Sequence, residues 1–477
     1  MKPRKKISLF LLVLLIVSGI DSIRNLPASA LFGSSLIFFF FFSALVFLIP
    51  TSLIAAELSA AMPDKGGVYH WMTKAFGEKA GMLAIWLQWI NTMVWYPTIL
   101  SFIAGTFAYL IDPSLAENKI YLLLSILIIF WGLTFLNLFG IAFSAKINSL
   151  CVLIGTMLPM TLLILLGIIW VASGNTPQIS FTWENILPTI NNNNSWVSLT
   201  AIIASFLGME LAGVHVNDIH NPQKNFPKAM GYSVLFLIIT MLFGALAIAT
   251  VLPVDEINLV AGVMQVFYTF FHTFGIEWAI PLLTLLIVVG SMGGIINWLI
   301  SPAKGLLHAA EFGFLHPFFM KKNRHGVAHN VLFMQALLVS FFCFAFLLVP
   351  SINAFYWFLT GLSTDLYLLM YILMFLSSLK LRYSYKERPL SFKIPGKSIG
   401  IWITALVGII GCVIALTVSF FPPEHIAIAK KDYALLIAGG NLLLLSPVLL
   451  FYLYKNKRWK KKKEKPEDQP EGRPFGI

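Results

Sequence analysis

The sequence predicts an all-α membrane protein with twelve transmembrane helices. The chain has 477 residues, of which 58% are hydrophobic and 11% are charged, and its mean hydropathy is +0.82. Soluble domains carry about 25% charged residues, so a water-soluble core-and-surface architecture is excluded. The 41 Phe and 13 Trp residues suit lipid-facing surfaces and interfacial belts.

Twelve apolar segments are long enough to span a bilayer, which needs about 20 such residues per helix. The first is expected to be an uncleaved helix, because no small-residue cleavage site follows it and a second apolar span begins at once. The predicted spans are residues 7–31, 34–61, 81–111, 120–140, 147–172, 196–216, 230–253, 271–303, 329–350, 353–379, 399–421 and 432–454.

The distribution of Lys and Arg predicts that both termini are cytoplasmic. With the N-terminus inside, 29 of the 33 basic residues fall in cytoplasmic segments, as the positive-inside rule requires. This bias also explains the net charge of +12 without a nucleic-acid partner. The stretch Lys455–Lys465 of the basic tail either lies along anionic lipid headgroups or acts only as a topology determinant.

Two of the spans are interrupted by polar residues and glycine. The first contains Ser18–Asn25 followed by Pro27, and the sixth contains Ser205–Glu210 followed by Gly213. Gly and Pro can simply kink a membrane helix. Paired interruptions in corresponding positions of two repeats instead predict a substrate site near the bilayer midplane, where free N–H groups attract a carboxylate and free C=O groups attract an ammonium.

A division into two five-helix repeats plus two further helices fits this pattern. The expected parts are a cytoplasmic N-terminus (1–6), the first repeat (7–172), an external loop (173–195), the second repeat (196–379), a cytoplasmic loop (380–398), helices eleven and twelve (399–454) and the tail (455–477).

Five charged residues lie within or at the ends of predicted spans: Asp21, Arg24, Glu57, Glu210 and Asp365. An unpaired charge at the centre of a helix costs at least ~2.5–3.5 kcal/mol in the membrane, so each is a candidate functional residue. Asp21 and Arg24 either pair on a continuous helix face or are separated by an unwound backbone. Asp365 is a candidate partner for Arg24, and Glu57 either serves function or holds a cytoplasmic loop.

Several segments carry a family resemblance. Ser205–Met230 is the most specific, followed by Gly66–Trp71 with the preceding Ala-Glu-Leu that contains Glu57. Trp298–Gly305 and Arg388–Gly396 match further landmarks. The chain resembles the amino acid–polyamine–organocation superfamily, and within it the glutamate/γ-aminobutyrate antiporter group.

The resemblance implies two inverted five-helix repeats with broken helices one and six. It also implies a substrate site between spans one, three, six, eight and ten, and exchange of one amino acid for another or for its decarboxylation product. Glu210 matches the sixth-span acid thought to couple protonation to gating, and Tyr367 and Tyr371 match paired tyrosines of the tenth span. Gly294 stands where glutamate/γ-aminobutyrate members have an acid, and Ala204 where an arginine-exchanging relative has a gating Trp.

We therefore predict a secondary active amino acid transporter of the bacterial cytoplasmic membrane, an exchanger that works by alternating access, with protons as a candidate second ligand. Because Arg24 adds a positive charge and Gly294 removes a negative one, a substrate with a neutral or acidic side chain is expected. An amino acid sensor of the same fold and a proton-coupled symporter are the alternatives. The predicted substrate-binding residues are Ile20, Asp21, Ser22, Ile23, Arg24, Ser205, Phe206, Gly208, Tyr367 and Tyr371, and the predicted proton-coupling or gating residues are Glu210 and Asp365.

No enzymatic activity, cofactor or metal is expected. The sequence contains no Walker loop, dinucleotide-binding glycine motif, metal-ligand cluster or nucleophile elbow. Cys151, Cys343 and Cys412 lie in apolar runs without ligand spacing, so they are expected to be packing residues.

Overall fold

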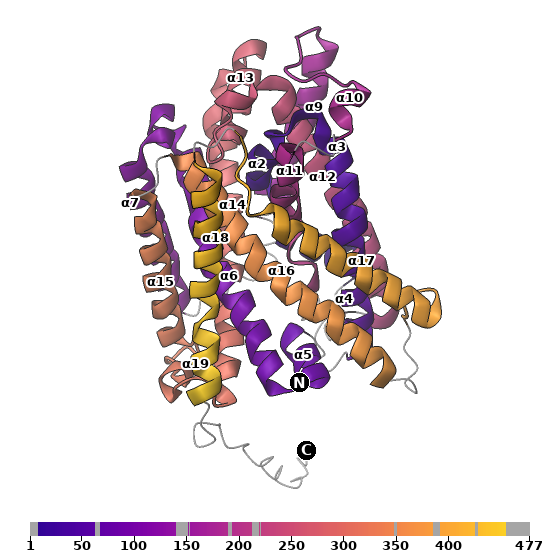
Figure 1. The fold of residues 1–477 in the computed structure, drawn as a ribbon. Coiled ribbons are helices and arrows are strands. Elements are labelled where there is room, and N and C mark those ends of the chain that lie inside the picture. The colour runs from indigo at the N-terminus through magenta and orange to yellow at the C-terminus, as the bar shows by residue number, and fades with distance from the viewer. Residues whose placement is uncertain are drawn as a thin grey trace, which may run out of the picture.

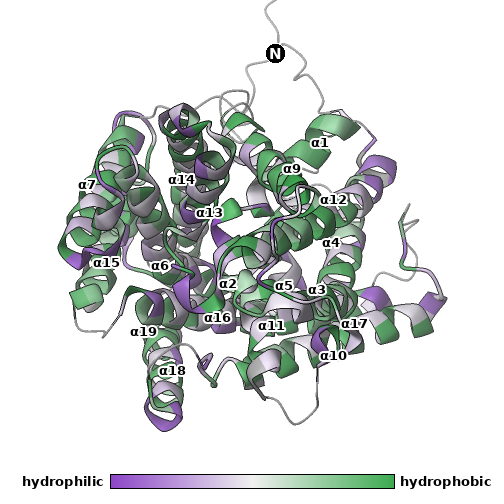
Figure 2. Cartoon of the chain, turned by 90° about the horizontal axis from the view of Figure 1, so that it is seen from above, coloured by the Kyte–Doolittle hydropathy of each residue, from purple (hydrophilic) through white to green (hydrophobic). Residues whose placement is uncertain are grey.

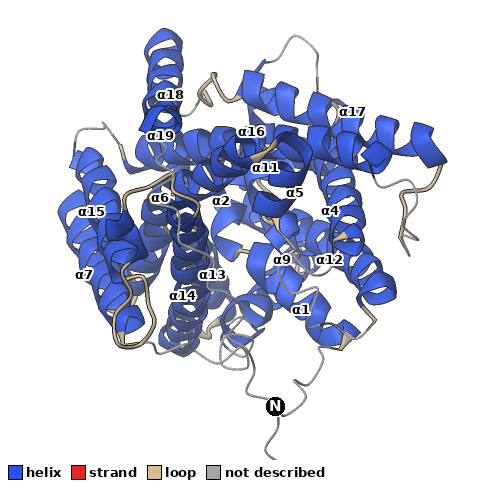
Figure 3. Cartoon of the chain, turned by 90° about the horizontal axis from the view of Figure 1, so that it is seen from below, coloured by secondary structure: helices blue, strands red, loops and turns tan. Residues whose placement is uncertain are grey.

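The computed structural model describes residues 8–62, 67–139, 151, 153–188, 193–211, 219, 221–347, 351–384, 392–424 and 428–454. The predicted basic tail and the end of the sixth predicted span lie outside these residues. The described chain is built from helices joined by turns and loops (Figures 1 and 3).

The helices follow one another along the whole chain. Their bounds are α1 Leu9–Ile20, η1 Ile23–Asn25, α2 Leu26–Ala30, η2 Gly33–Ser35, α3 Leu36–Ser43, η3 Ala44–Leu48, α4 Ile49–Ala61, α5 Val68–Phe76, α6 Glu78–Ala108, η5 Pro113–Glu117, α7 Lys119–Leu138, η6 Leu153–Met157, α9 Leu158–Ala172, α10 Trp183–Ile186, α11 Asn193–Ser205, α12 Pro222–Val251, η8 Val254–Glu256, α13 Gly262–Phe274, η9 Glu277–Ala279, α14 Ile280–Glu311, η10 Pro317–Met320, α15 His329–Phe344, η11 Ala345–Leu347, α16 Ile352–Ser384, α17 Lys397–Val418, α18 Lys430–Leu445 and α19 Pro447–Tyr454.

These helices confirm the all-α membrane fold. Within the described residues, eight helices are long and apolar enough to cross a bilayer, and the apolar helices 195–211 and 329–344 are shorter. Each of the twelve predicted spans overlaps one or more of the helices in the structure. Whether the chain crosses the membrane twelve times stays a prediction.

α5, α10 and α13 were not predicted as separate elements. α5 and α10 lie in segments expected to be loops, and α13 reaches only the first residues of the eighth predicted span. The predicted bounds 271–303 were therefore wrong at their start, since α14 begins at Ile280. The reason is Gly275, whose φ of +68° ends α13 in the left-handed conformation that favours glycine.

The most buried helices form the centre of the bundle. In α16, 78% of the most apolar window is buried, whereas α17 and the α18–α19 pair have only 33% and 17% of theirs buried. α18 and α19 stand at the edge in both end views, and Figure 2 shows apolar residues over much of the outer helices. The outer helices therefore have the surface expected of a protein embedded in lipid.

The two ends of the bundle carry different elements. α10 and α13 lie at one end, while α5 and the end of α19 lie at the other (Figure 1). The Tyr452 hydroxyl donates a 2.7 Å hydrogen bond to the Lys79 carbonyl, so the last helix ends beside the start of α6. The described chain thus ends on the same side as the α5–α6 turn.

Glu57 holds the segment that follows α16. Its carboxylate accepts a 2.5 Å hydrogen bond from Arg382 Nη1 and a 2.7 Å bond from the Ile394 N–H. The residue is only 4% exposed, and it forms an ion pair with Arg382. Glu57 was expected either to serve function or to hold the loop that follows span two, whereas these bonds join it to α16 and to the segment after that helix.

A close backbone approach joins η6 to α14 beside the interior cavity described below. A Cβ added to Gly155 would overlap the Cα of Gly290 and the carbonyl oxygen of Leu286, and a Cβ on Gly290 would overlap Gly155. Backbone atoms cannot rotate away as a side chain can. Only glycine at both positions allows the two helices to approach this closely.

We predict that Gly155→Ala destabilises the protein by about 1–3 kcal/mol, because the new methyl group overpacks the contact. Gly132→Ala is the matched control, since no heavy atom lies within 4 Å of a Cβ added there. Thermal unfolding in detergent measures both variants. Equal melting temperatures for the two variants would show that α14 can move away from η6 at little cost.

Candidate functional site

The first predicted span is broken in the structure. α1 ends at Ile20, where the Asp21 N–H donates to the Val17 carbonyl at 2.7 Å. Asp21 and Ser22 are extended, with ψ angles of 118° and 113°. The chain then enters η1 and α2, with Pro27 in the first turn of α2, where proline is tolerated. The break leaves C-terminal carbonyls of α1 without intrahelical donors.

The sixth predicted span is interrupted next to this break. α11 ends at Ser205, and the chain continues as a turn in which Gly208 has φ +112°, a conformation that favours glycine. A Cβ on Gly208 would lie 3.5 Å from Ile20 Cγ1 and 3.9 Å from the Gly19 carbonyl oxygen. The two breaks are therefore in contact, although they are almost two hundred residues apart in the sequence.

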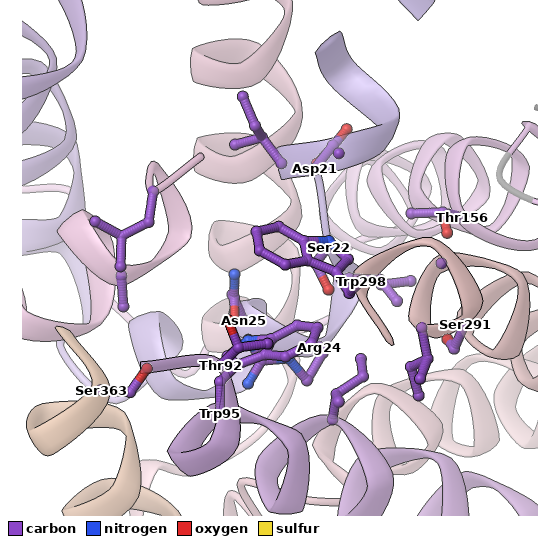
Figure 4. A pocket seen from close by; sticks show the side chains of 18 of the residues that line it. Asp21, Ser22, Arg24, Asn25, Thr92, Trp95, Thr156, Ser291, Trp298 and Ser363 are labelled. Atoms are coloured by element: carbon purple, nitrogen blue, oxygen red, sulfur yellow. The ribbon is translucent and has the colours of Figure 1, made fainter. Parts of the chain in front are cut away.

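A cavity lies at the first break (Figure 4). Its wall comes from the break itself, α6, η6, the end of α11 and the turn after it, α14 and α16, which correspond to predicted spans one, three, five, six, eight and ten. The lining residues are Gly19, Ile20, Asp21, Ser22, Ile23, Arg24, Asn25, Asn91, Thr92, Trp95, Ile99, Thr156, Ala204, Leu207, Gly290, Ser291, Gly294, Ile295, Trp298, Ser363 and Tyr367.

Arg24 places a buried positive charge in the cavity wall. Its side chain is 4% exposed, and Nη1 donates to the hydroxyls of Thr98 at 2.8 Å and Tyr356 at 2.9 Å. The guanidinium carbon lies 5.3 Å from the ring centre of Trp95, and the two side chains lie together in Figure 4. All of these partners are neutral. No carboxylate of the described residues forms an ion pair with Arg24.

Asp21 places a buried carboxyl group in the same wall. It is 5% exposed, and neither carboxyl oxygen makes a hydrogen bond within the described chain. The neighbouring Thr240 hydroxyl donates to the Phe236 carbonyl at 3.0 Å instead. The unwound backbone separates Asp21 from Arg24, so the two do not form the local ion pair that a continuous helix would allow.

Glu210 lies beside the second break within a cluster of hydroxyl groups. The hydroxyl of Tyr367 donates to Oε1 at 2.5 Å, and that of Tyr371 donates to Oε2. Gln88 Nε2 lies 3.5 Å from Oε1 and donates to the Tyr367 hydroxyl at 3.2 Å. The Gly208 N–H donates to the Tyr371 hydroxyl at 2.8 Å. Tyr367 also lines the cavity, so it joins the cavity to this cluster.

The predicted site residues fall into two sets. Ile20, Asp21, Ser22, Ile23, Arg24 and Tyr367 line the cavity, whereas Gly208, Glu210 and Tyr371 form the adjoining cluster. Ser205 and Phe206 belong to neither the cavity lining nor the Glu210 cluster. The Ser205 hydroxyl donates to the Ile202 carbonyl at 2.6 Å, and the Phe206 ring packs against Phe40.

Asp365 lies apart from the cavity and does not pair with Arg24. It is fully buried at the contact between α16 and α18, where Oδ2 accepts a 2.8 Å hydrogen bond from Asn441. The hypothesis that it balances the charge of Arg24 was therefore wrong. Its role in proton coupling or gating stays a prediction.

Sequence reasoning missed the polar residues that the other helices contribute. Asn91 donates to both the carbonyl and the hydroxyl of Ser363, at 2.6 and 2.8 Å, which joins α6 to α16 at the cavity. Thr92, Thr156 and Ser291 complete the polar lining. The available signal was an amide beside a hydroxyl, Asn91-Thr92, in the middle of an apolar span.

Comparisons with known proteins find a family, related transporters and a shared fold. A family model described as amino acid permease matches residues 7–442. An uncharacterised transporter of Legionella pneumophila is 40% identical over 94% of this chain and 97% of its own. A glutamate/γ-aminobutyrate antiporter of Lactococcus lactis is 30% identical over 89% and 85%, respectively. A solved manganese transporter of Eremococcus coleocola shares the fold, with a TM-score of 0.58 and 12% identity over 94% of each chain.

We predict that Tyr371→Phe lowers the free energy of unfolding by about 1–3 kcal/mol. Without the Tyr371 hydroxyl, the buried Glu210 Oε2 loses a donor and the Gly208 N–H loses its acceptor. Tyr232→Phe, at a position that is 58% exposed, is the control. Thermal melting of the two purified variants measures the difference. If Tyr371→Phe has the same melting temperature as the parent protein, the Tyr371 hydroxyl does not hold the two breaks together.

Proposed function

Because the chain belongs to the amino acid permease family, we propose that it is a secondary active amino acid exchanger that works by alternating access. The protein is a multi-pass membrane transporter and not an enzyme. The proposed substrates are amino acids with neutral or acidic side chains. The proposed location is a bacterial cytoplasmic membrane, with both termini on the cytoplasmic side.

The observation that carries the proposal is the pair of buried charges at the first break. Asp21 and Arg24 both line the cavity, and neither is paired with an opposite charge within the described chain. An uncompensated buried charge is costly, so each favours a ligand group of opposite charge. Asp21 also follows the carbonyl end of α1, which adds negative potential to its own. A zwitterionic amino acid supplies an ammonium for Asp21 and a carboxylate for Arg24.

The charge of the cavity wall also supports a substrate whose side chain is neutral or acidic. Arg24 would repel a second cation in a low-dielectric cavity, and Gly294 on the α14 wall contributes no acid to bind one. No heavy atom lies within 4 Å of a Cβ added to Gly294, so the wall is open there. Neutral and acidic side chains fit this arrangement better than arginine, lysine or polyamines. The relative named as a glutamate/γ-aminobutyrate antiporter supports the same choice.

Glu210 is the proposed residue for proton coupling. An ionised Glu210 accepts from both Tyr367 and Tyr371, whereas a protonated one must donate through one oxygen. One tyrosine would then have to reorient. Tyr367 lines the cavity and Tyr371 holds Gly208 at the second break, so protonation would change a contact at one of these two places.

Counterflow in proteoliposomes tests the proposal. Vesicles loaded with unlabelled glutamate, glutamine or alanine should take up the radiolabelled amino acid, and empty vesicles should not. Uptake into empty vesicles driven by a pH gradient would instead indicate a proton symporter. Substrate-dependent thermal stabilisation without any flux would indicate a sensor.

We predict that Arg24→Gln raises the apparent KM for the accepted amino acid by roughly 10–100-fold, because a charge-assisted hydrogen bond is worth about 1.5–3 kcal/mol. Arg24→Lys keeps the charge and should lose less. Lys430→Gln, at an exposed position at the start of α18, is the control and should transport like the parent. Arginine or putrescine outcompeting glutamate, glutamine and alanine in the parent protein would contradict the role given to Arg24.

We further predict that Glu210→Gln flattens the pH profile of exchange between about pH 5 and pH 8, since glutamine cannot gain or lose a proton there. Substrate should still protect this variant against thermal unfolding. Asp432→Asn, an exposed acid at the start of α18, should keep the parent profile. An unchanged profile in Glu210→Gln would assign the pH dependence to another group.

A further inference from the structure

A second buried polar site lies between α16 and α18, away from the cavity. A stripe of α16 residues spaced four apart faces a stripe of α18 residues with the same spacing. A Cβ on Gly361 would lie 3.1 Å from the Tyr433 hydroxyl and 3.4 Å from Ile437 Cδ1, so the two helices pack closely. The facing residues are Trp357, Gly361 and Asp365 on α16 and Tyr433, Ile437 and Asn441 on α18.

Asp365 has one satisfied carboxyl oxygen and one that has no partner. Oδ2 accepts from Asn441 Nδ2 at 2.8 Å, whereas Oδ1 makes no hydrogen bond, and neither does Asn441 Oδ1. The neighbouring Ser419 hydroxyl donates to the Leu416 carbonyl at 2.9 Å, so its proton is not available to Asp365. The nearby Tyr433 hydroxyl makes no hydrogen bond to Asp365 within the described chain, so Asp365 Oδ1 and Asn441 Oδ1 are both acceptors without a donor.

The surroundings give Asp365 no counter-charge. Its side chain is 0% exposed, and no Lys, Arg or His of the described chain forms an ion pair with it. The titratable neighbour on α18 is Tyr433, a neutral phenol, and Trp357 on its own helix carries no charge. A single neutral amide compensates a buried carboxylate poorly in such a setting.

We propose that Asp365 holds a proton and forms a neutral acid–amide pair with Asn441, a proton-binding site outside the substrate cavity. The proton on Oδ1 turns that oxygen into a donor for Asn441 Oδ1 or Ser419 Oγ, while Oδ2 keeps its bond from the amide. One proton thereby gives a partner to the orphaned carboxyl oxygen and to a neighbouring acceptor.

This pairing gives α18 a fixed attachment to the bundle. α18 stands at the edge, with little of its surface buried, so a neutral pair of hydrogen bonds in an apolar contact holds it without a buried charge. It also leaves Asp365 neutral, so that it cannot offset the charge of Arg24. The proposal does not depend on which substrate the cavity takes.

Infrared spectroscopy of the purified full-length protein tests the proposal. The spectrum of the parent minus that of Asp365→Asn should contain the carbonyl band of a protonated carboxylic acid at pH 7. Asp112→Asn is the control, because Asp112 is an exposed cap whose pKa is lowered by the hydrogen bond from the Ser114 N–H, and its loss should remove no such band.

Thermal stability provides the second readout. Asp365→Asn keeps a neutral donor and acceptor in place, so its melting temperature should fall by less than half as much as that of Asp365→Ala, which leaves the Asn441 amide unpaired. Absence of the carboxylic acid band overturns the proposal. A parent melting temperature that rises with Na⁺ or K⁺, and no longer does so in Asp365→Asn, would assign the site to a metal cation and overturn it as well.

Discussion

An unwound stretch of backbone within a membrane-spanning bundle is the constraint that the surrounding helices satisfy. Peptide groups without intrahelical partners are tolerated there only where protein surrounds them or a cavity hydrates them. The chain meets this condition by setting the break after Ile20 against the turn at Gly208 and enclosing it with α6, α14 and α16. The glycine contact of η6 with α14 lies in the same wall. These long helices are central because they cover the break.

The buried acids of this chain are stabilised in different ways. Glu57 is compensated by a full ion pair with Arg382, which suits a fixed structural contact. Glu210 is held by hydroxyl donors that can reorient, which suits a group that changes its protonation. Asp365 has a single amide, and a proton would complete its bonding. Asp21 has no hydrogen-bond partner within the described chain, so a bound ligand would have to supply one. The number and kind of partners thus distinguish the acid held in an ion pair from the acids proposed to bind a proton or a ligand.

The cavity and the Glu210 cluster lie on different helices from α17 and α18, which lie at the outer surface of the bundle. The cavity and the Glu210 cluster draw on helices from both proposed repeats and meet at Tyr367. α17 and α18 contribute no residue to the cavity lining and expose most of their apolar surface. Motion of one repeat against the other would change the cavity while the outer helices keep their contact with lipid.

Local composition was sufficient to predict the fold class, the approximate spans and the two breaks. Apolar runs must be buried in lipid, and polar groups within them must be enclosed. The sequence also identified Asp21, Arg24 and Glu210. The partners of these residues follow from tertiary packing. Arg24 contacts Trp95 and Tyr356 instead of Asp365, and Asn91 and Ser363 join the site from helices far apart in the chain. Partner choice depends on how helices pack and rotate against one another, and periodicity along one helix does not specify which neighbour faces it.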